Sequence, residues 1–230
     1  MEAKLFVIEA LSSMHVGNGE INYGLIDNLI QRDPVTEMPI INSSSLKGAL
    51  REYFKHLKES KKDTKWTVAK IFGSDPKDNT NRKQGSVRFF EAELLAIPVR
   101  CNDKPYKMVT SEDTVKGLKA KLESFGMGIY EEKINELFKG IELTTTHQEL
   151  KELCSDDELP VISRNNLESG QSTNLWYEQV LPKHSLLGFV VMGDESETFK
   201  AFCEELGKAK VQIGANATIG YGFCKISEVC

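Results

Sequence analysis

The chain has 230 residues, 40% of them hydrophobic and 27% charged, with a formal net charge of −5 at pH 7. This length and hydrophobic content allow a substantial buried core and argue against wholesale disorder. The apolar runs, such as residues 186–192, are too short to span a bilayer, and the first residues have no signal-peptide pattern. We therefore expect no contact with a membrane. The five cysteines lack CxxC spacing, which favours reduced thiols in the cytoplasm over disulfides or a zinc site.

Charge is distributed unevenly along the chain. Between Lys47 and Arg88, twelve Lys or Arg residues stand against five Asp or Glu residues, so this stretch carries +7 and the remainder −12. Such a segment can form a positive track for a phosphate backbone on an otherwise acidic protein. A solvated basic face without a partner explains the same pattern.

The N-terminal third begins with a mostly apolar run, residues 4–11, which predicts a buried strand. Residues 12–42 contain glycines, two prolines and no helical period, and predict a long loop of the kind that is usually functional. Within it, Asp33 followed by proline indicates a turn. Apolar residues at helical spacing then predict a helix over residues 44–59, with N-cap candidates in the serine run 43–45.

The middle of the chain has weaker patterns. Residues 86–95 predict a strand, the region 99–109 favours another, and residues 112–139 favour helix interrupted by Gly126 and Gly128. The polar, turn-rich residues 74–84 are expected to be mobile. Segments 161–165 and 175–180 flank a turn-rich connector, 167–173, which predicts a hairpin.

The C-terminal part predicts a strand over residues 186–192, an amphipathic helix over 195–206, and strands at 211–213 and 222–227 around a glycine-rich loop. Both ends of the chain therefore have the order strand, helix, strand. This order predicts an α+β fold with a ferredoxin-like core and irregular insertions. No linker divides the chain, so we expect a single domain over residues 1–230.

Two segments have the composition of phosphate-binding sites. The run SSSLKGALR places Ser43, Ser44, Ser45, Lys47 and Arg51 at a helix start, where free N–H groups and hydroxyls can bind an anion. A capped helix with lysines facing water is the alternative. The glycine-rich loop 214–222 allows close approach of the backbone to a ligand, although a tight connection between strands explains it equally. Its spacing excludes a Walker A loop and a dinucleotide-binding fingerprint.

Candidate chemistry rests on two residues of the long loop. Asp27 can hold Mg²⁺, and His15 can orient a group or accept a proton at neutral pH. A turn-capping carboxylate and a structural imidazole are the alternatives. Trp176 and Tyr177, beside the expected hairpin, can stack on bases or pack in the protein.

Several segments taken together resemble one family. They are HVGNGE, LIDNLIQRDP, SSSLKGALREYFK, IFG at 71–73, IPVR at 97–100, LWYEQ at 175–179 and QIGANATIGYG. In this order and separation they resemble the backbone subunits of type III-B CRISPR effectors (the Cmr complex), members of the RAMP superfamily. The equivalent type III-A (Csm) subunits have a similar IDNxxxRDP–SSLKG stretch and are the alternative, but LWYEQ and IPVR are more similar to Cmr.

The resemblance implies a modified ferredoxin-like (RRM-like) palm from residues 1–95 and 186–230. Insertions and a thumb hairpin, the thumb near residues 163–174, would lie within 96–185. It also implies a helical filament of several copies along one CRISPR RNA, with other Cmr subunits as partners. Base pairing with the guide would select the target RNA, and each subunit would cut it once.

The resemblance also assigns residues. Asp27 matches the family's cleavage carboxylate, with Mg²⁺ or another divalent metal as cofactor, and His15 matches a supporting histidine. Matches to guide-backbone contacts are Ser43, Ser44, Ser45, Lys47, Arg51, Gly214, Ala215, Asn216, Gly220 and Gly222. The chain departs from the family at Ala217, where some relatives have a glutamate, and by a shorter middle.

Three other functions compete with this interpretation. The chain can be a scaffold subunit that binds RNA without cleaving it. It can be a stand-alone RAMP nuclease that processes CRISPR transcripts with His15 as general base and without metal. It can also be a ferredoxin-like binder of a metabolite, with no affinity for RNA.

Overall fold

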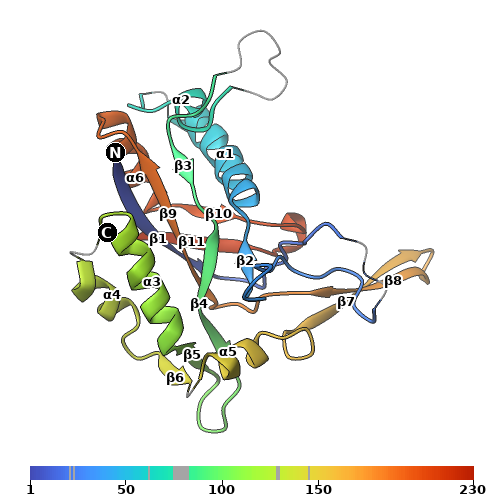
Figure 1. Ribbon diagram of the computed structural model, residues 1–230. Coiled ribbons are helices and arrows are strands. Elements are labelled where there is room, and N and C mark those ends of the chain that lie inside the picture. Colours follow the sequence, from blue (N-terminus) through green and yellow to red (C-terminus); the bar gives the residue numbers. More distant parts are fainter. Residues whose placement is uncertain (21, 23, 62, 75–82, 128–129, 145) are drawn as a thin grey trace.

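A nine-stranded mixed sheet forms the centre of the protein (Figure 1). The computed structural model describes residues 1–20, 22, 24–61, 63–74, 83–127, 130–144 and 146–230. Along the sheet the main strands are β10 (Lys210–Gln212), β11 (Phe223–Glu228), β1 (Glu2–Ala10), β9 (Leu186–Gly193), β4 (Ala92–Val99), β5 (Lys107–Ser111) and β6 (Glu142–Thr144). The short strands β2 (Ile40–Ile41) and β3 (Arg88–Phe89) pair with β4 and β9.

The inner strands have ferredoxin-like topology. In chain order, β1 leads into helix α1 (Ser43–Ser60), then β4, β9, helix α6 (Glu197–Leu206) and β11. In space the order is β11, β1, β9, β4, and each neighbouring pair is antiparallel. This is the strand order of a βαββαβ unit, so the predicted α+β ferredoxin-like fold is confirmed. The assignment of residues to one domain with a palm and insertions stays a prediction.

Side-chain alternation along β1 separates two hydrophobic layers. Phe6 and Ile8 enter the larger core, which also contains buried residues of α1 and α6. Leu5 and Val7 enter a smaller core on the other face, with residues of α3 (Glu112–Ser124) and α4 (Glu131–Leu137). Because successive side chains of a strand point to opposite faces, one apolar run supplies both layers.

The strongly periodic helices were predictable. Helix α1 buries Leu46, Leu50 and Phe54, and its bounds agree with the expected helix 44–59. Helix α6 is capped by Ser196, whose hydroxyl accepts the Phe199 N–H. The short helices α2 (Val68–Phe72) and α5 (His147–Leu153) lie in segments for which the sequence predicted no helix.

Two expectations for the middle of the chain were wrong in detail. The strand expected at 86–95 is divided into β3 and β4, which both pair with β9. Between them Phe90 still donates its N–H to the Val190 carbonyl over 3.1 Å, and its ring packs on Phe125, 4.7 Å between ring centroids. The strand expected within 99–109 begins only at Lys107. The interruption expected at Gly126 is confirmed, since helix α3 ends before this residue, whose φ of 73° is left-handed. Of the segment expected to be mobile, residues 75–82 lie outside the described residues.

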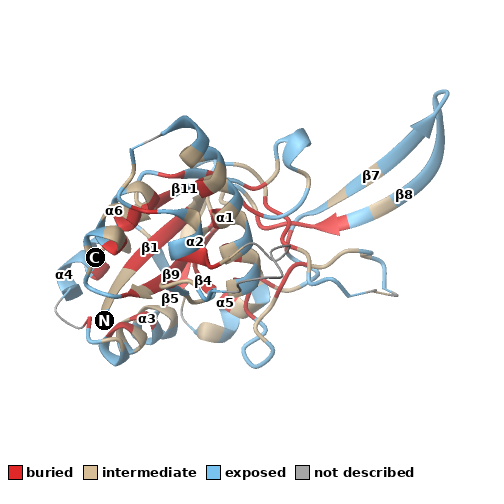
Figure 2. Ribbon diagram, turned by 90° about the horizontal axis from the view of Figure 1, so that it is seen from above, coloured by how far each residue is buried: buried red, intermediate tan, exposed pale blue. Residues whose placement is uncertain are grey.

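A two-stranded hairpin of β7 (Val161–Glu168) and β8 (Gln171–Gln179) projects from the body (Figures 1 and 2). Ser169 and Gly170 have positive φ angles of 51° and 83°, as in a two-residue type I′ turn. The expected connector 167–173 was therefore too long, since Leu167 and Glu168 already pair with β8. Figure 2 shows the hairpin exposed along most of its length, with burial at the base of β8.

The structure bears on two expectations from composition, the absence of a membrane span and the reduced state of the cysteines. No helix among them has both the length and the apolar character needed to cross a bilayer. All five cysteines are free, and burial raises the pKa of Cys154 and of Cys224 to about 12. These two thiols are therefore protonated at neutral pH, which makes them poor nucleophiles and metal ligands.

Phe54 is the centre of the larger core. Its ring centroid lies 4.9 Å from those of Trp66 and Phe202. We expect Phe54→Ala to lower the free energy of unfolding by about 3–5 kcal/mol, because it opens a cavity among aromatic rings. Phe223→Ala, the same truncation at a side chain 45% exposed, should cost about 1 kcal/mol or less. Urea denaturation of both variants measures the difference, and equal losses would contradict this description of the core.

Candidate nucleic-acid interface

The base of the hairpin is joined to the long N-terminal loop by backbone hydrogen bonds. Asp27 and Asn28 both donate their N–H groups to the Tyr177 carbonyl, each over 3.1 Å. Gln179 donates its N–H to the Asn28 carbonyl over 2.9 Å. We call this region, where residues 12–42, the base of β8 and the glycine-rich loop 214–222 meet, the hairpin junction.

Asp27 lies at the surface of the hairpin junction with an oriented side chain. Its carboxylate Oδ2 accepts the N–H of Tyr177 over 2.8 Å. The side chain is exposed, so the carboxylate can meet a ligand while the β8 backbone fixes its direction. The bond spans 150 positions of the sequence and does not close a local turn.

His15 is buried behind this surface, with only 5% of its area exposed. Its Nδ1 lies 2.6 Å from the carbonyl oxygen of Gln179. A carbonyl only accepts, so Nδ1 carries the proton and donates it, and Nε2 is left as the acceptor in the neutral ring. The imidazole packs against Gly17, where an added Cβ would lie 3.0 Å from Nε2. His15 and Asp27 thus bind β8 at Gln179 and Tyr177, two positions apart along the strand.

The glycine-rich loop is pressed against the same segment. Ala215 donates its N–H to the His15 carbonyl over 2.9 Å, and Gly222 donates to the Ser13 carbonyl over 2.8 Å. A Cβ on Gly214 would overlap the His15 carbonyl oxygen, and one on Gly222 would overlap that of Ile213. Gly220 also has a left-handed φ, +83°, but faces open space. The glycines at 214 and 222 are therefore required by close backbone packing within the protein.

The start of α1 is attached to the hairpin junction by Gln31, a residue that the sequence did not single out. Its buried side chain donates to the Ser45 hydroxyl over 3.0 Å and to the Gly17 carbonyl over 3.1 Å. Its Oε1 accepts the N–H of Asn42 over 2.8 Å. Asn42 is the N-cap of α1 and forms no side-chain cap bond, so the expected serine cap was wrong.

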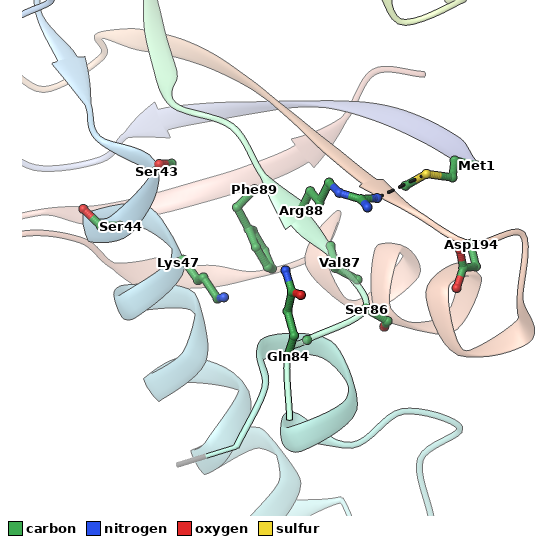
Figure 3. Close-up of a pocket in the computed structure, with 11 residues that line it drawn as sticks. Met1, Ser43, Ser44, Lys47, Gln84, Ser86, Val87, Arg88, Phe89 and Asp194 are labelled. Atoms are coloured by element: carbon green, nitrogen blue, oxygen red, sulfur yellow. Dashed lines mark hydrogen bonds between the residues drawn. The ribbon is translucent and has the colours of Figure 1, made fainter. Parts of the chain in front are cut away.

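Two cavities flank the first turns of α1. Ser45, Gly17 and Gly214 line one of about 630 Å³ between the helix and the glycine-rich loop. Ser43, Ser44 and Lys47 line a second, of about 480 Å³, with β3 on its far side (Figure 3). The three consecutive serines therefore face two different hollows.

The cationic residues of this region have protein partners. Figure 3 shows Lys47 directed toward Phe89, with Nζ 6.0 Å from the ring centroid. Arg51 donates to the Gly73 carbonyl over 3.2 Å and so ties α1 to the end of α2. Farther along, Lys61 pairs with Glu205 of α6. Acidic residues of α6 thus neutralise part of the basic segment, which the local charge count could not reveal.

The hairpin junction also contains a buried carboxylate, that of a β8 residue. Glu178 is 6% exposed and accepts from Trp176 Nε1 over 2.9 Å and from Asn216 Nδ2 over 2.8 Å. Arg164 Nη1 lies 3.3 Å from the same carboxylate, above the Trp176 ring. Trp176, expected as a possible base-stacking residue, is thus occupied within the protein, whereas Tyr177 is 40% exposed. Glu178 belongs to the LWYEQ segment, but its sequence neighbours do not mark it as buried, because Asn216 and Arg164 come from other segments.

Comparison with known protein families assigns the chain to one of them. The family model described as the RAMP superfamily matches residues 7–225. The chain belongs to the RAMP superfamily.

Several characterised proteins are similar to this RAMP chain. The CRISPR system Cmr endoribonuclease Cmr4 of Pyrococcus furiosus is 28% identical over 99% of the chain and 96% of the relative. That alignment runs over 287 residues, so the relative contains segments that the 230-residue chain lacks. A CMR subunit Cmr4 of Saccharolobus solfataricus is 33% identical over 53% of the chain and 39% of its own length.

Solved structures share the RAMP fold. A chain of the type III-B Cmr-beta complex in the apo state matches with a TM-score of 0.77 at 22% identity, covering 99% of this chain and 97% of that one. Oligomeric Cmr4 from Pyrococcus furiosus matches with a TM-score of 0.69 at 20% identity, covering 99% and 98%. At these identities the likeness concerns the fold.

Two glycines of this RAMP protein form a matched pair for testing the packing of the loop. Both Gly220 and Gly222 have left-handed φ angles, so alanine at either should cost about 1–2 kcal/mol of stability. Gly222→Ala adds an overlap with the Ile213 carbonyl and should cost at least about 1 kcal/mol more than Gly220→Ala. Thermal or urea unfolding of the two variants gives the comparison. Equal costs would mean that the loop packs less tightly than described.

Proposed function

We propose that this RAMP protein is a backbone subunit of a type III-B CRISPR effector. In this role several copies bind one CRISPR RNA, and each cleaves the guide-paired target RNA. The observation that carries the proposal is the exposed Asp27 carboxylate, which the β8 backbone orients at the hairpin junction. A solvent-accessible carboxylate held by a rigid strand, beside a glycine-rich loop and a helix start, suits a reaction on an RNA backbone.

The relatives support the same role. Those named above are Cmr subunits, and the Pyrococcus protein, called an endoribonuclease, aligns with almost the whole chain. One solved relative is a Cmr-beta complex bound to cognate target RNA, and another is an oligomer of Cmr4. These names favour type III-B over type III-A. We also propose the cytoplasmic location that the sequence led us to expect.

Guide binding is assigned to the two faces of the α1 N-terminus and to the glycine-rich loop. The hydroxyls of Ser43 and Ser44 and the ammonium of Lys47 line one cavity, and Ser45 and Gly214 line the other. Unpaired N–H groups at a helix start attract phosphate oxygens. Exposed Ala215 and Gly220 let an RNA backbone approach the loop, and Asn216 is partly exposed beside them. Arg51, bound to the Gly73 carbonyl, contributes through its remaining donors.

Cleavage is assigned to attack by a ribose 2′-oxygen of the target on the adjacent phosphorus. The new O–P bond forms as the bond to the 5′-oxygen breaks, leaving a cyclic phosphate and a 5′-oxygen that takes a proton from water to become a hydroxyl. Asp27 accepts the proton of the 2′-hydroxyl or orients the group that does. His15, buried and bonded to Gln179, supports this site by holding the loop on β8.

The residues present fit a divalent metal that is held largely by the substrate. Among the described residues there is no group of three or more His, Cys, Asp or Glu side chains suited to a metal. Mg²⁺ is commonly bound by one or two carboxylates, with water and phosphate oxygens completing its shell. Asp27 would supply that carboxylate, and the metal would neutralise charge developing on the phosphate.

The stand-alone nuclease is the weaker alternative. Its general base would be His15, but that ring is 5% exposed and its Nε2 faces Gly17. A general base must come within hydrogen-bond reach of the proton it removes. Incubation of the isolated chain with precursor RNA in EDTA tests this alternative, since cutting there would favour it.

Asp27→Ala should abolish target cutting by the assembled complex, with a loss of about 100-fold or more in single-turnover rate. Binding of guide and target should be unchanged, because the carboxylate is not assigned to the guide. Quantifying cleaved target by gel electrophoresis, with binding measured in parallel, separates the two effects.

Asp103→Ala, an exposed aspartate in the connection between β4 and β5, is the matched control and should cut at the wild-type rate. If the Asp27 variant also cut normally, the catalytic assignment would be wrong. A wild-type complex that never cuts would indicate the non-cleaving scaffold. The same assay in EDTA tests the metal, since unchanged cutting would remove it from the proposal.

The purified protein should form oligomers whose size follows the length of an added CRISPR-type RNA. Because phosphate contacts release counterions, assembly should weaken as salt rises from about 50 to about 200 mM. Size-exclusion chromatography with light scattering measures both effects. A species whose size is independent of RNA length, with the other Cmr subunits present, would contradict the filament. A chain that ignores RNA altogether, even then, would favour the metabolite binder.

A further inference from the structure

Among the described residues, Glu178 is the only aspartate or glutamate that is buried, and neither the residue roles implied by the family nor the proposed chemistry uses it. We propose that Glu178 is a positioning residue for target cleavage, which fixes the hairpin relative to the glycine-rich loop. This inference rests on the proposed function, because it concerns the geometry of the same site.

The argument begins with two adjacent residues of β8. The backbone of Tyr177 holds Asp27, by its N–H to the carboxylate and by its carbonyl to the Asp27 N–H. The side chain of the next residue, Glu178, holds Asn216 of the glycine-rich loop over 2.8 Å. A displacement of β8 at this point therefore moves Asp27 relative to the loop.

The bond to Asn216 is specified by the fold. Asn216 has a left-handed φ of 64° and directly follows Ala215, which is bonded to the His15 carbonyl. His15 in turn binds the carbonyl of Gln179. Glu178 and Gln179 thus attach to the loop by two independent routes, one through a side chain of the loop and one through its backbone.

Because it is buried, the Glu178 carboxylate needs hydrogen-bond donors from the protein. An ionised group withdrawn from water is tolerated only when donors surround it, and Trp176, Asn216 and Arg164 supply them. The Arg164 guanidinium lies between the rings of Trp176 and Tyr221, at 5.5 and 6.0 Å from their centroids. The Tyr221 ring is partly buried, and this burial raises the pKa of its hydroxyl.

The contact can be changed without emptying the hydrophobic cores. Residues 161–179 contribute no member to either hydrophobic cluster, which are built from the sheet and its helices. Replacement of Glu178 should therefore loosen the hairpin junction more than it destabilises the fold. A misplacement of about 1 Å between reacting groups can reduce a rate about 100-fold.

The test uses the assembled complex with guide and target RNA. In Glu178→Met both acceptor oxygens are removed, so the bonds from Asn216 and Trp176 are lost. We expect a fall of about 10- to 100-fold in single-turnover cleavage, with target affinity within about threefold of wild type. Glu136→Met, the same change at an exposed residue of α4, should leave both values unchanged.

An exchange of partners distinguishes positioning from a general effect on structure. In Glu178→Gln with Asn216→Asp, the glutamine amide donates to the new carboxylate, and its oxygen still accepts from Trp176. Because Asn216 is also assigned to the guide, cleavage is expressed per guide-loaded complex. On that scale the double variant should recover single-turnover cleavage to within about threefold of wild type, whereas Asn216→Asp alone, with two facing carboxylates, should be impaired by about 10-fold or more.

Each outcome decides the inference. Wild-type cleavage by Glu178→Met overturns it, as does a double variant that assembles and remains as impaired as the single ones. If neither the single variants nor the double variant assembles, the inference is also overturned, because the role is then structural. If the single variants fail to assemble and the double variant assembles and cuts, the contact is supported. Loss of cutting in the wild-type complex, or its persistence in Asp27→Ala, is a failure of the proposed function instead.

Discussion

The structure around the proposed site depends on the hydrogen bonds of one edge of β8, the edge that does not pair with β7. At its base this edge pairs with the loop of residues 12–42, not with a strand of the central sheet. Buried backbone groups must find partners, so the loop has to follow β8 closely. The same constraint determines the direction of the Asp27 carboxylate, the tautomer of His15 and the approach of the glycine-rich loop. The proposed catalytic and binding elements, distant in sequence, are thereby held by one strand end.

The central sheet and the hairpin junction have different stabilising interactions. The sheet is stabilised on both faces by burial of apolar side chains, with α1 and α6 on one face and α3 on the other. At the hairpin junction buried Gln31, Glu178 and Gln179 also link separate segments by hydrogen bonds, beside core residues such as Met14 and Ile30. Hydrophobic packing is tolerant of small shifts, whereas hydrogen bonds require defined distances and angles. The proposed reaction, which depends on alignment, therefore lies where hydrogen bonds specify the geometry.

The sequence predicted the elements with strong periodicity and missed contacts between distant segments. The spacing of Leu46, Leu50 and Phe54 was sufficient for α1, and the continuous apolar run of residues 4–11 for β1. The short helices α2 and α5 have too few turns for a period to emerge. Asp27 and His15 were marked by motif, yet their common partner β8 was not, because that pairing is tertiary. Glu178 reads locally as an ordinary charged residue of a strand, and only the fold shows it to be buried.

Beyond its base the hairpin consists of two strands whose outer edges carry unpaired backbone groups. Such edges can template the addition of strands from other molecules, which leads to aggregation. The outer part of this hairpin is rich in polar residues: Asn165, Asn166, Glu168, Gln171, Ser172, Thr173 and Asn174. This composition disfavours the dry, apolar contacts between sheets that stabilise fibrils. The projecting hairpin therefore combines reach with colloidal stability in the isolated chain.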